Sequence, residues 1–120
     1  MKHADLTDLV LNAFYKVYNM LGYGFLEKVY ENALAIELRD QGLNVLQQAR
    51  FQVLYKGRPV GDYQADMIVE KQIVVEVKAV RALESAHRAQ VINYLRATGL
   101  RAALLLNFGL PRIEYERLLG

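Results

Sequence analysis

The sequence predicts a single α/β domain with a mixed β-sheet, in the order of two helices, three strands, a helix and one or two strands. Apolar residues recur every three or four positions in the first 41 residues, which is the spacing of helices. From residue 45 apolar and polar residues alternate, which is the spacing of strands. A further helical stretch then precedes a continuous apolar run, so we expect a right-handed helical crossover between parallel strands.

Length and composition are consistent with one domain over residues 1–120 and exclude several classes of protein. No apolar run approaches the roughly 20 residues that span a bilayer, and the polar start is unlike a signal peptide, so we expect no membrane association. The chain has no cysteine and only two histidines, which leaves oxygen atoms as the expected metal ligands. A cysteine-free chain fits the reducing cytoplasm, where we place the protein. The net charge of +2 permits a polyanionic partner without arguing for one.

Two amphipathic helices are expected first, over residues 5–21 and about 25–41, each ended by a glycine, Gly22 or Gly42. The expected core positions of the second helix are Leu26, Val29, Tyr30, Ala33, Leu34 and Leu38. Glu27 lies near the start of this helix, where an acidic side chain complements the helix dipole. That structural interpretation of Glu27 needs no functional site.

Three strands are expected next, over residues 45–55, 60–69 and 73–80. Residues 56–59, with one glycine and one proline, are expected to form the first turn. The following helix is expected over residues 85–98. Its apolar contacts are expected from Ala89, Ile92, Leu95 and Ala97.

The last part of the chain is expected to complete the sheet. Residues 101–107 form a continuous apolar strand suited to burial on both faces, and residues 113–118 are expected to add an edge strand.

Strand register decides whether Asp66 and Glu76 can act together. A two-residue turn between their strands would set Asp66 opposite Val77 and send the two acids to opposite faces. A three-residue loop over residues 70–72 would instead set Asp66 opposite Glu76, although no glycine is there to ease the turn. Lys78 lies two residues after Glu76 and therefore projects to the same side.

These three charged residues suit the hydrolysis of phosphodiester bonds. Asp66 and Glu76 can hold Mg²⁺, which retains several waters and accepts a substrate phosphate as a further ligand. Lys78 can orient the attacking water or stabilise charge on the phosphate, and the acids favour its protonated form. Glu and Lys two residues apart also occur on ordinary solvated strands, so the spacing alone leaves both interpretations open.

The pattern D-(x)₉-E-V-K, followed by a helix carrying Gln90, resembles the PD-(D/E)XK nuclease superfamily. Five separated blocks, covering about residues 21–118, resemble more narrowly the GxxExxY proteins of that superfamily. The blocks are G-F-L-E-K-V-Y (Gly24, Glu27, Tyr30), A-D-M-I-V-E (Asp66), V-V-E-V-K-A-V (Glu76, Lys78), A-H-R-A-Q-V-I-N-Y-L (His87, Gln90, Tyr94) and L-L-L-N-F-G (Asn107, Phe108, Gly109). Ala65 stands where the motif has proline, a departure that is common in the superfamily.

The resemblance implies a restriction-endonuclease-like core and a role for each matching residue. It implies that Asp66 and Glu76 are metal carboxylates for Mg²⁺, with Mn²⁺ as a substitute, and that the Val77 carbonyl is a candidate third ligand. The remaining implied roles are the catalytic lysine for Lys78, support of the metal or its waters for Glu27, and a place near the site for Gln90.

The resulting expectation is a nuclease that acts on nucleic acid, with DNA as the preferred substrate. Candidate contacts to the nucleic acid are Arg81, Arg88, His87 and Tyr94. His87 and Tyr94 either pack or contact a phosphate. The basic residues are scattered, which favours a solvated surface over contacts with nucleic acid. The alternative is a catalytically inactive nuclease fold that binds nucleic acid or protein. A homodimer is expected because two sites are needed to cut both strands at once and the tyrosine-rich first helix offers an interface.

Overall fold

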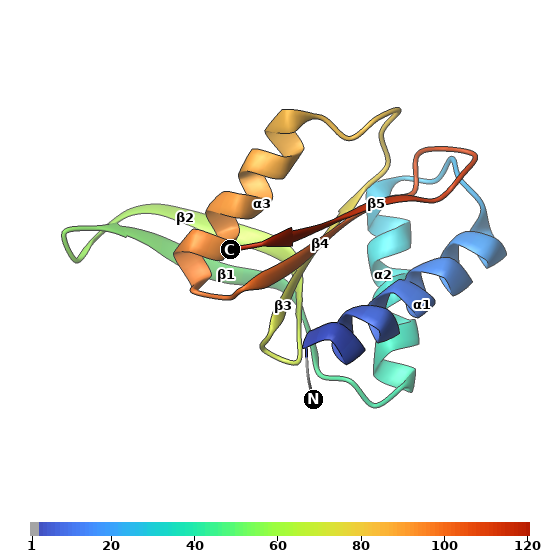
Figure 1. Cartoon of the computed structure of the whole chain (residues 1–120), viewed down its shortest axis with the longest axis horizontal. Helices are drawn as coiled ribbons and strands as arrows, with labels where there is room; N and C mark the ends of the chain where they lie inside the picture. Colours follow the sequence, from blue (N-terminus) through green and yellow to red (C-terminus); the bar gives the residue numbers. More distant parts are fainter. Residues whose placement is uncertain (1–2) are drawn as a thin grey trace.

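A computed structural model describes residues 3–120. Its elements are α1 (His3–Leu21), α2 (Glu27–Asp40), β1 (Val45–Tyr55), β2 (Arg58–Val69), β3 (Ile73–Lys78), α3 (Ser85–Thr98), β4 (Ala102–Asn107) and β5 (Glu114–Leu119). The strands form one sheet in the order β1-β2-β3-β4-β5, in which β3 and β4 are parallel and the other neighbours antiparallel (Figure 1). The predicted α/β class, element order and helical crossover to a parallel strand are confirmed.

Helices cover both faces of the sheet (Figure 1). The larger apolar cluster joins α1 and α2 to one face of β3 and β4, and a smaller cluster joins α3 to the other face. Every residue of β4 is buried, because this strand is enclosed on both sides, and this explains its continuous apolar sequence. Within residues 3–120, none of the helices is both long enough and apolar enough to cross a membrane.

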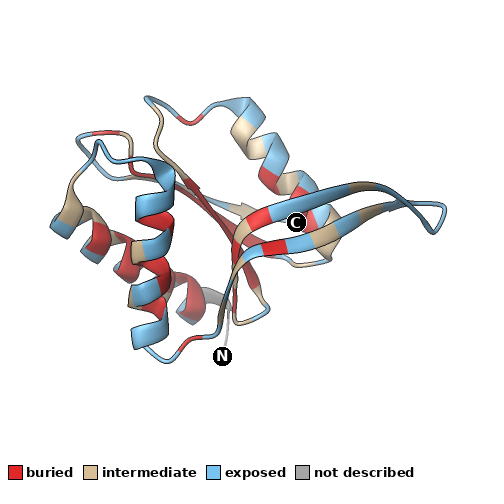
Figure 2. Cartoon of the chain, turned by 180° about the vertical axis from the view of Figure 1, so that it is seen from behind, coloured by how far each residue is buried: buried red, intermediate tan, exposed pale blue. Residues whose placement is uncertain are grey.

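β1 and β2 extend beyond the sheet as a two-stranded arm (Figure 2). The turn consists of two residues, Lys56 and Gly57, whose φ angles of 50° and 76° are those of a tight hairpin turn matched to strand twist. The predicted four-residue turn over residues 56–59 was therefore wrong at its end, since Arg58 already pairs with Tyr55.

The core positions of α2 differ from the prediction at the start of the helix. The helix begins at Glu27 rather than residue 25, so Leu26 precedes it and is 81% exposed, while Val29 is 41% exposed. The buried face consists of Tyr30, Glu31, Leu34, Ala35 and Leu38. A stripe shifted by one position includes an acidic residue that the apolar pattern had left out.

The buried face of α3 also differs from the prediction. Val91, Tyr94 and Leu95 are buried against the sheet, whereas Ala89 is exposed and Ile92 and Ala97 are only half-buried. Small and polar residues surround the few large ones on this helix, so its periodicity permitted more than one phase.

Tyr30 fixes the entry to α2. Its ring stacks on Phe108 with centroids 4.3 Å apart and an interplanar angle of 12°. Its hydroxyl donates to the Gly22 carbonyl at 2.7 Å and accepts the Phe25 N–H at 3.1 Å. The buried tyrosine thereby orders the loop before α2 and places the first turn of the helix.

Asn107 and Gly109 lock the end of β4 to the segment after β3. The buried Asn107 side chain accepts the Val80 N–H at 3.0 Å and donates to the Val80 carbonyl at 2.9 Å. These side-chain bonds replace the ladder, so β3 ends at Lys78 and not at residue 80 as predicted. Gly109 lies so close to this segment that an added Cβ would be 2.3 Å from both the nitrogen and the oxygen of Val80.

We expect Gly109→Ala to lower the free energy of unfolding by more than about 2 kcal/mol, because the new methyl group would overlap rigid backbone. Urea unfolding followed by circular dichroism measures this change. Gly61→Ala is the matched control: its Cβ would meet only the ring of the exposed Tyr63, at 3.1 Å, and we expect a loss below about 1 kcal/mol. Equal losses in the two variants would contradict the close approach at Gly109.

Candidate active site

The sheet divides into two branches beside Asp66. The β2–β3 ladder runs from Val69 opposite Ile73 to Met67 opposite Val75, where the pairing stops. β2 then continues with β1 alone, while β3 continues with β4. The three residues 70–72 connect the two strands, as the odd-loop prediction required, and this register brings Asp66 and Glu76 to the same place.

The turn without glycine is achieved by two ordinary residues. Glu70 and Lys71 adopt φ angles of 53° and 55°, in the left-handed region. The Glu70 carboxylate accepts the Asn44 N–H at 2.7 Å, and its own N–H donates to the Asn44 carbonyl at 2.8 Å. These two bonds hold the strained turn against the start of β1.

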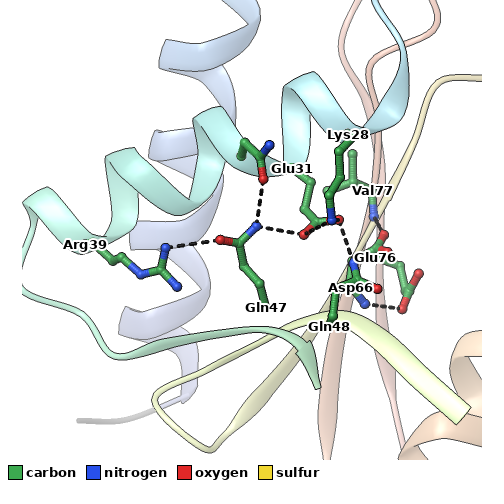
Figure 3. Close-up of polar contacts among 9 residues, drawn as sticks. Lys28, Glu31, Arg39, Gln47, Gln48, Asp66, Glu76 and Val77 are labelled. Atoms are coloured by element: carbon green, nitrogen blue, oxygen red, sulfur yellow. Dashed lines mark hydrogen bonds and ion pairs between the residues drawn. The ribbon is translucent and has the colours of Figure 1, made fainter. Parts of the chain in front are cut away.

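At the branch point the two acids replace the missing backbone ladder (Figure 3). The Asp66 N–H donates to Glu76 Oε1 at 2.9 Å, and the Val77 N–H donates to Asp66 Oδ2 at 2.7 Å. Each acid thus has one oxygen bound by a backbone amide, which fixes the orientation of both.

Burial and mutual repulsion favour the protonated form of this acid pair. Glu76 is only 4% exposed, and burial, followed by the charge of Asp66, raises its pKa to about 8. Burial also raises the pKa of Asp66, against the opposing effect of the hydrogen bond from Val77. A cation beside the pair would reverse this effect, because opposite charge favours ionised carboxylates.

The positive charge of Lys78 partly offsets the negative charge of the acid pair. It lies at the end of β3, is half-buried, and lowers the pKa of both Asp66 and Glu76. The two ion pairs found within residues 3–120 are Lys28–Glu31 and Arg88–Glu116, so the Lys78 ammonium group is not held in a close ion pair there.

Glu27 reaches the same end of β3 from the other side of the core. Its side chain is exposed, and Oε2 accepts the Ala79 N–H at 3.1 Å. The contact joins the first turn of α2 to the residue directly after Lys78. Glu27 therefore lies beside the end of β3 that carries Lys78, although the two residues are far apart in sequence.

Glu31 is a site residue that the sequence analysis missed. It is 3% exposed, and its negative charge contributes to the raised pKa of Asp66. Figure 3 shows its carboxylate between α2 and β1, where it accepts hydrogen bonds from Gln47 at 2.7 Å and Gln48 at 2.9 Å and pairs with Lys28 at 3.3 Å. An acid four residues after Glu27 and three before Leu34, on the buried stripe of a helix, was the available signal.

The conformation of Gln48 interrupts the pairing of β1 with β2 at Asp66, whose N–H is bonded to Glu76 instead. On β1, Gln47 pairs with Met67 and Ala49 with Ala65, but Gln48, which would face Asp66, is absent from the ladder. Its φ angle is 50°, and its amide is directed to Glu31. The irregularity in β1 therefore lies directly opposite Asp66.

Tyr94 and Gln90 border the acid pair from α3. Tyr94 is buried, and its pKa is raised first by burial and then by the charges of Glu76 and Asp66. Gln90, one turn earlier on the same helix, is exposed and lines a cavity together with Tyr94.

His87 and Arg88 make structural contacts, and Arg81 is exposed. His87 Nδ1 accepts the Glu84 N–H at 3.0 Å in a capping box that starts α3. Arg88 forms an ion pair with Glu116 and donates to the Leu83 carbonyl at 3.3 Å. Arg81 lies in the segment that follows β3. Their contact with nucleic acid stays a prediction.

The donors at the branch point are those that Mg²⁺ uses. Among residues 3–120, no three histidine, aspartate or glutamate side chains converge in a way that would hold an ion by themselves. Mg²⁺ is commonly held by one or two carboxylates together with waters and substrate phosphate, so Asp66 and Glu76 are a sufficient protein contribution. The buried, repelling carboxyl pair fits such a cation.

The sequence matches the family model of the PD-(D/E)XK nuclease superfamily over residues 4–118, and the chain belongs to this superfamily. Its fold is similar to that in the crystal structure of SSO0001, with a TM-score of 0.58 and 19% sequence identity. That alignment covers 98% of this chain and 59% of the other chain, so this chain spans about three fifths of that length. No curated protein gives a significant match. The narrower GxxExxY assignment stays a prediction.

We expect the melting temperature of the protein in EDTA to fall as the pH rises from 5 to 8. The pKa of the Glu76 carboxyl is 4.5 in the unfolded chain and is raised to about 8 in the folded protein. Between these two pH values the folded state binds more protons than the unfolded state, so the folded state loses stability as the pH rises. Glu76→Gln, which stays neutral, should reduce this fall, and differential scanning fluorimetry measures it.

Asp62→Asn serves as the matched control, because Asp62 is an exposed acid on the same strand β2. The control should keep the pH dependence of the wild type. An equal fall in wild type and Glu76→Gln would show that the buried acid does not govern the effect.

Proposed function

We propose that this protein is a Mg²⁺-dependent nuclease that hydrolyses phosphodiester bonds, with DNA as the preferred substrate. The observation that carries the proposal is the buried pair of Asp66 and Glu76 beside Lys78 at the branch point of the sheet. Superfamily membership supports the nuclease class, and PD-(D/E)XK nucleases generally use divalent metals. A cytoplasmic location and the GxxExxY assignment belong to the same proposal.

Asp66 and Glu76 would hold the metal ion, with the Val77 carbonyl as a third ligand. When bound, Mg²⁺ or Mn²⁺ supplies a Lewis acid that polarises the phosphate and lowers the pKa of a bound water. The protein contributes orientation, since Val77 and Asp66 amides hold one oxygen of each carboxylate in place. Fixing these side chains before substrate binding avoids an ordering cost during the reaction.

Lys78 would stabilise the negative charge that develops on the phosphate. A fixed positive charge suits phosphoryl chemistry better than a group that must first lose a proton.

Glu27 and Gln90 would act from the two helices. Glu27 binds the amide of Ala79 and so fixes the residue that follows Lys78, while part of its carboxylate can bind waters around the metal. Gln90 lines a cavity together with Tyr94, which lies near the acids. Arg81, Arg88, His87 and Tyr94 are the proposed contacts to nucleic acid.

We expect Glu76→Gln and Lys78→Ala each to lower the rate of Mg²⁺-dependent cleavage of plasmid or oligonucleotide by about 100-fold or more, because the first removes a charged metal ligand and the second removes positive charge at the phosphate. Gel assays in Mg²⁺ and in Mn²⁺ measure the rates. Lys71→Ala, an exposed lysine in the turn before the same strand, is the matched control and should keep wild-type activity.

Equal cleavage by the wild type and both site variants would identify a contaminant and remove the assignment. Salt-dependent binding of nucleic acid without cleavage by any protein would support the alternative, a catalytically inactive binding module. Absence of binding at low salt would contradict both functions.

We also propose a homodimer. The tyrosines that suggested the first helix as an interface are partly used within the chain, since Tyr18 donates to the Leu110 carbonyl at 2.7 Å. Apolar side chains around the start of α2 are more exposed. They are Met20, Tyr23, Phe25, Leu26 and Val29.

Light scattering at micromolar concentration is expected to give twice the chain mass of 13.7 kDa. Leu26→Ser should lower the apparent mass toward that of one chain, because it removes an apolar group that is 81% exposed without touching the core. A monomeric wild type would contradict the proposal.

A further inference from the structure

An aromatic pocket lies between the β1–β2 arm and α3, beside the acid pair. We use this name for the cavity of about 580 Å³ lined by Phe51 and Tyr63 from the arm and by Gln90, Asn93, Tyr94 and Arg96 from the helix. The roles proposed above leave Phe51, Tyr63, Asn93 and Arg96 without a function.

Three aromatic rings form one wall of the pocket. Phe51 and Tyr63 lie nearly parallel, with centroids 6.2 Å apart and an interplanar angle of 21°. Tyr94 meets Phe51 edge-on at 5.1 Å and lies 6.1 Å from Tyr63. Tyr94 is the buried member of the cluster, whereas Tyr63 is 49% exposed and Phe51 is half-buried. The arm therefore presents aromatic surface to solvent, where a flat ring can stack on it.

Polar groups at the rim suit the edges and the backbone of a nucleotide. Gln90 and Asn93 are exposed, and a side-chain amide offers both donors and an acceptor. Arg96 is also exposed and donates to Asn93 Oδ1 at 3.4 Å, which holds both groups on the same rim. A guanidinium group can bind phosphate or stack on a planar ring.

Tyr94 connects the aromatic pocket to the acid pair. Burial, and then the charges of Glu76 and Asp66, raise the pKa of Tyr94, and Gln90 lines the pocket together with Tyr94. On β2, Tyr63 precedes Asp66 by three residues, which corresponds to about 10 Å along a strand. A strand whose phosphate lies at the acids can therefore place a neighbouring base at the rings.

We propose that the aromatic pocket binds an unpaired nucleobase of the strand whose phosphate is held at Asp66 and Glu76. The inference rests on the proposed function and narrows it: the substrate is single-stranded, or locally unpaired, at the cleavage position. A base within a duplex is stacked on both faces and cannot reach the rings without leaving the helix. Stacking on aromatic side chains with amide groups at the rim is how proteins recognise splayed bases.

The test compares binding of fluorescent oligonucleotides in EDTA, where cleavage is absent, by wild type and three variants. Tyr63→Ala is expected to weaken binding of a single-stranded 12-mer by about five-fold to 100-fold, the range found when one stacked base loses its aromatic partner. Tyr63→Phe keeps the ring and should bind like the wild type. Tyr55→Ala is the matched control, because Tyr55 is 64% exposed on the same arm but lies outside the pocket.

Three further arms identify the ligand. A hairpin duplex of the same sequence should be unaffected by Tyr63→Ala. A set of 12-mers, each with one abasic position at a different place, locates the bound base. At one place the missing base should weaken binding by the wild type as much as Tyr63→Ala does. At that place it should not weaken binding by Tyr63→Ala any further. Parallel measurements with single-stranded DNA and RNA distinguish the two sources of the base.

Equal effects of Tyr63→Ala and Tyr55→Ala, or equal effects on duplex and single strand, would overturn the pocket assignment. If the nuclease proposal alone fails, the result is different. Neither the wild type nor any variant then cleaves a substrate with Mg²⁺, but Tyr63→Ala still weakens binding of the single strand. Intact cleavage together with no loss in Tyr63→Ala would leave the nuclease and remove the pocket.

Discussion

The site depends on one exchange of hydrogen bonds, in which two acidic side chains take over from a backbone ladder. Where β2 leaves β3, the amides of Asp66 and Val77 would otherwise lose their partners. The carboxylates of Glu76 and Asp66 satisfy them at 2.9 and 2.7 Å. A buried amide without a partner costs about 1–3 kcal/mol, so the acids stabilise the branch point while the branch point orients the acids. The same bonds serve the fold and the chemistry.

Helix α2, on the face of the sheet opposite α3, contributes contacts around this site. Tyr30 stacks on Phe108 and orders the loop before α2, and Glu27 then reaches the amide of Ala79. One turn further on, Glu31 holds Gln48 away from the β1 ladder. The segment that carries Gly24, Glu27 and Tyr30 is thus positioned by aromatic packing. Glu27 contacts the residue after β3 and Glu31 contacts β1, so these two acids lie on opposite sides of the branch point.

Much of this arrangement could be predicted from the sequence. Alternation defined the strands, and parity required the odd loop that sets Asp66 opposite Glu76. The burial of Glu31 was missed because an apolar stripe assigned only to hydrophobic residues has no place for an acid, even though Gln47 and Gln48 satisfy it. The phase of α3 was missed because its small and polar residues make several faces equivalent. The aromatic pocket joins Phe51, Tyr63 and Tyr94 from three elements, a proximity that no local pattern contains.

The loop at residues 70–72 limits how sequences of this kind can change. Surface turns usually tolerate insertion or deletion, because closing a slightly longer loop costs little entropy. Here the number of residues must stay odd, since one residue more or fewer would turn the acid of one strand away from that of the other. Substitution at Lys71 or Gln72 keeps the length of the loop. A change in length by a single codon instead abolishes the alignment of Asp66 with Glu76, and no side chain can restore it.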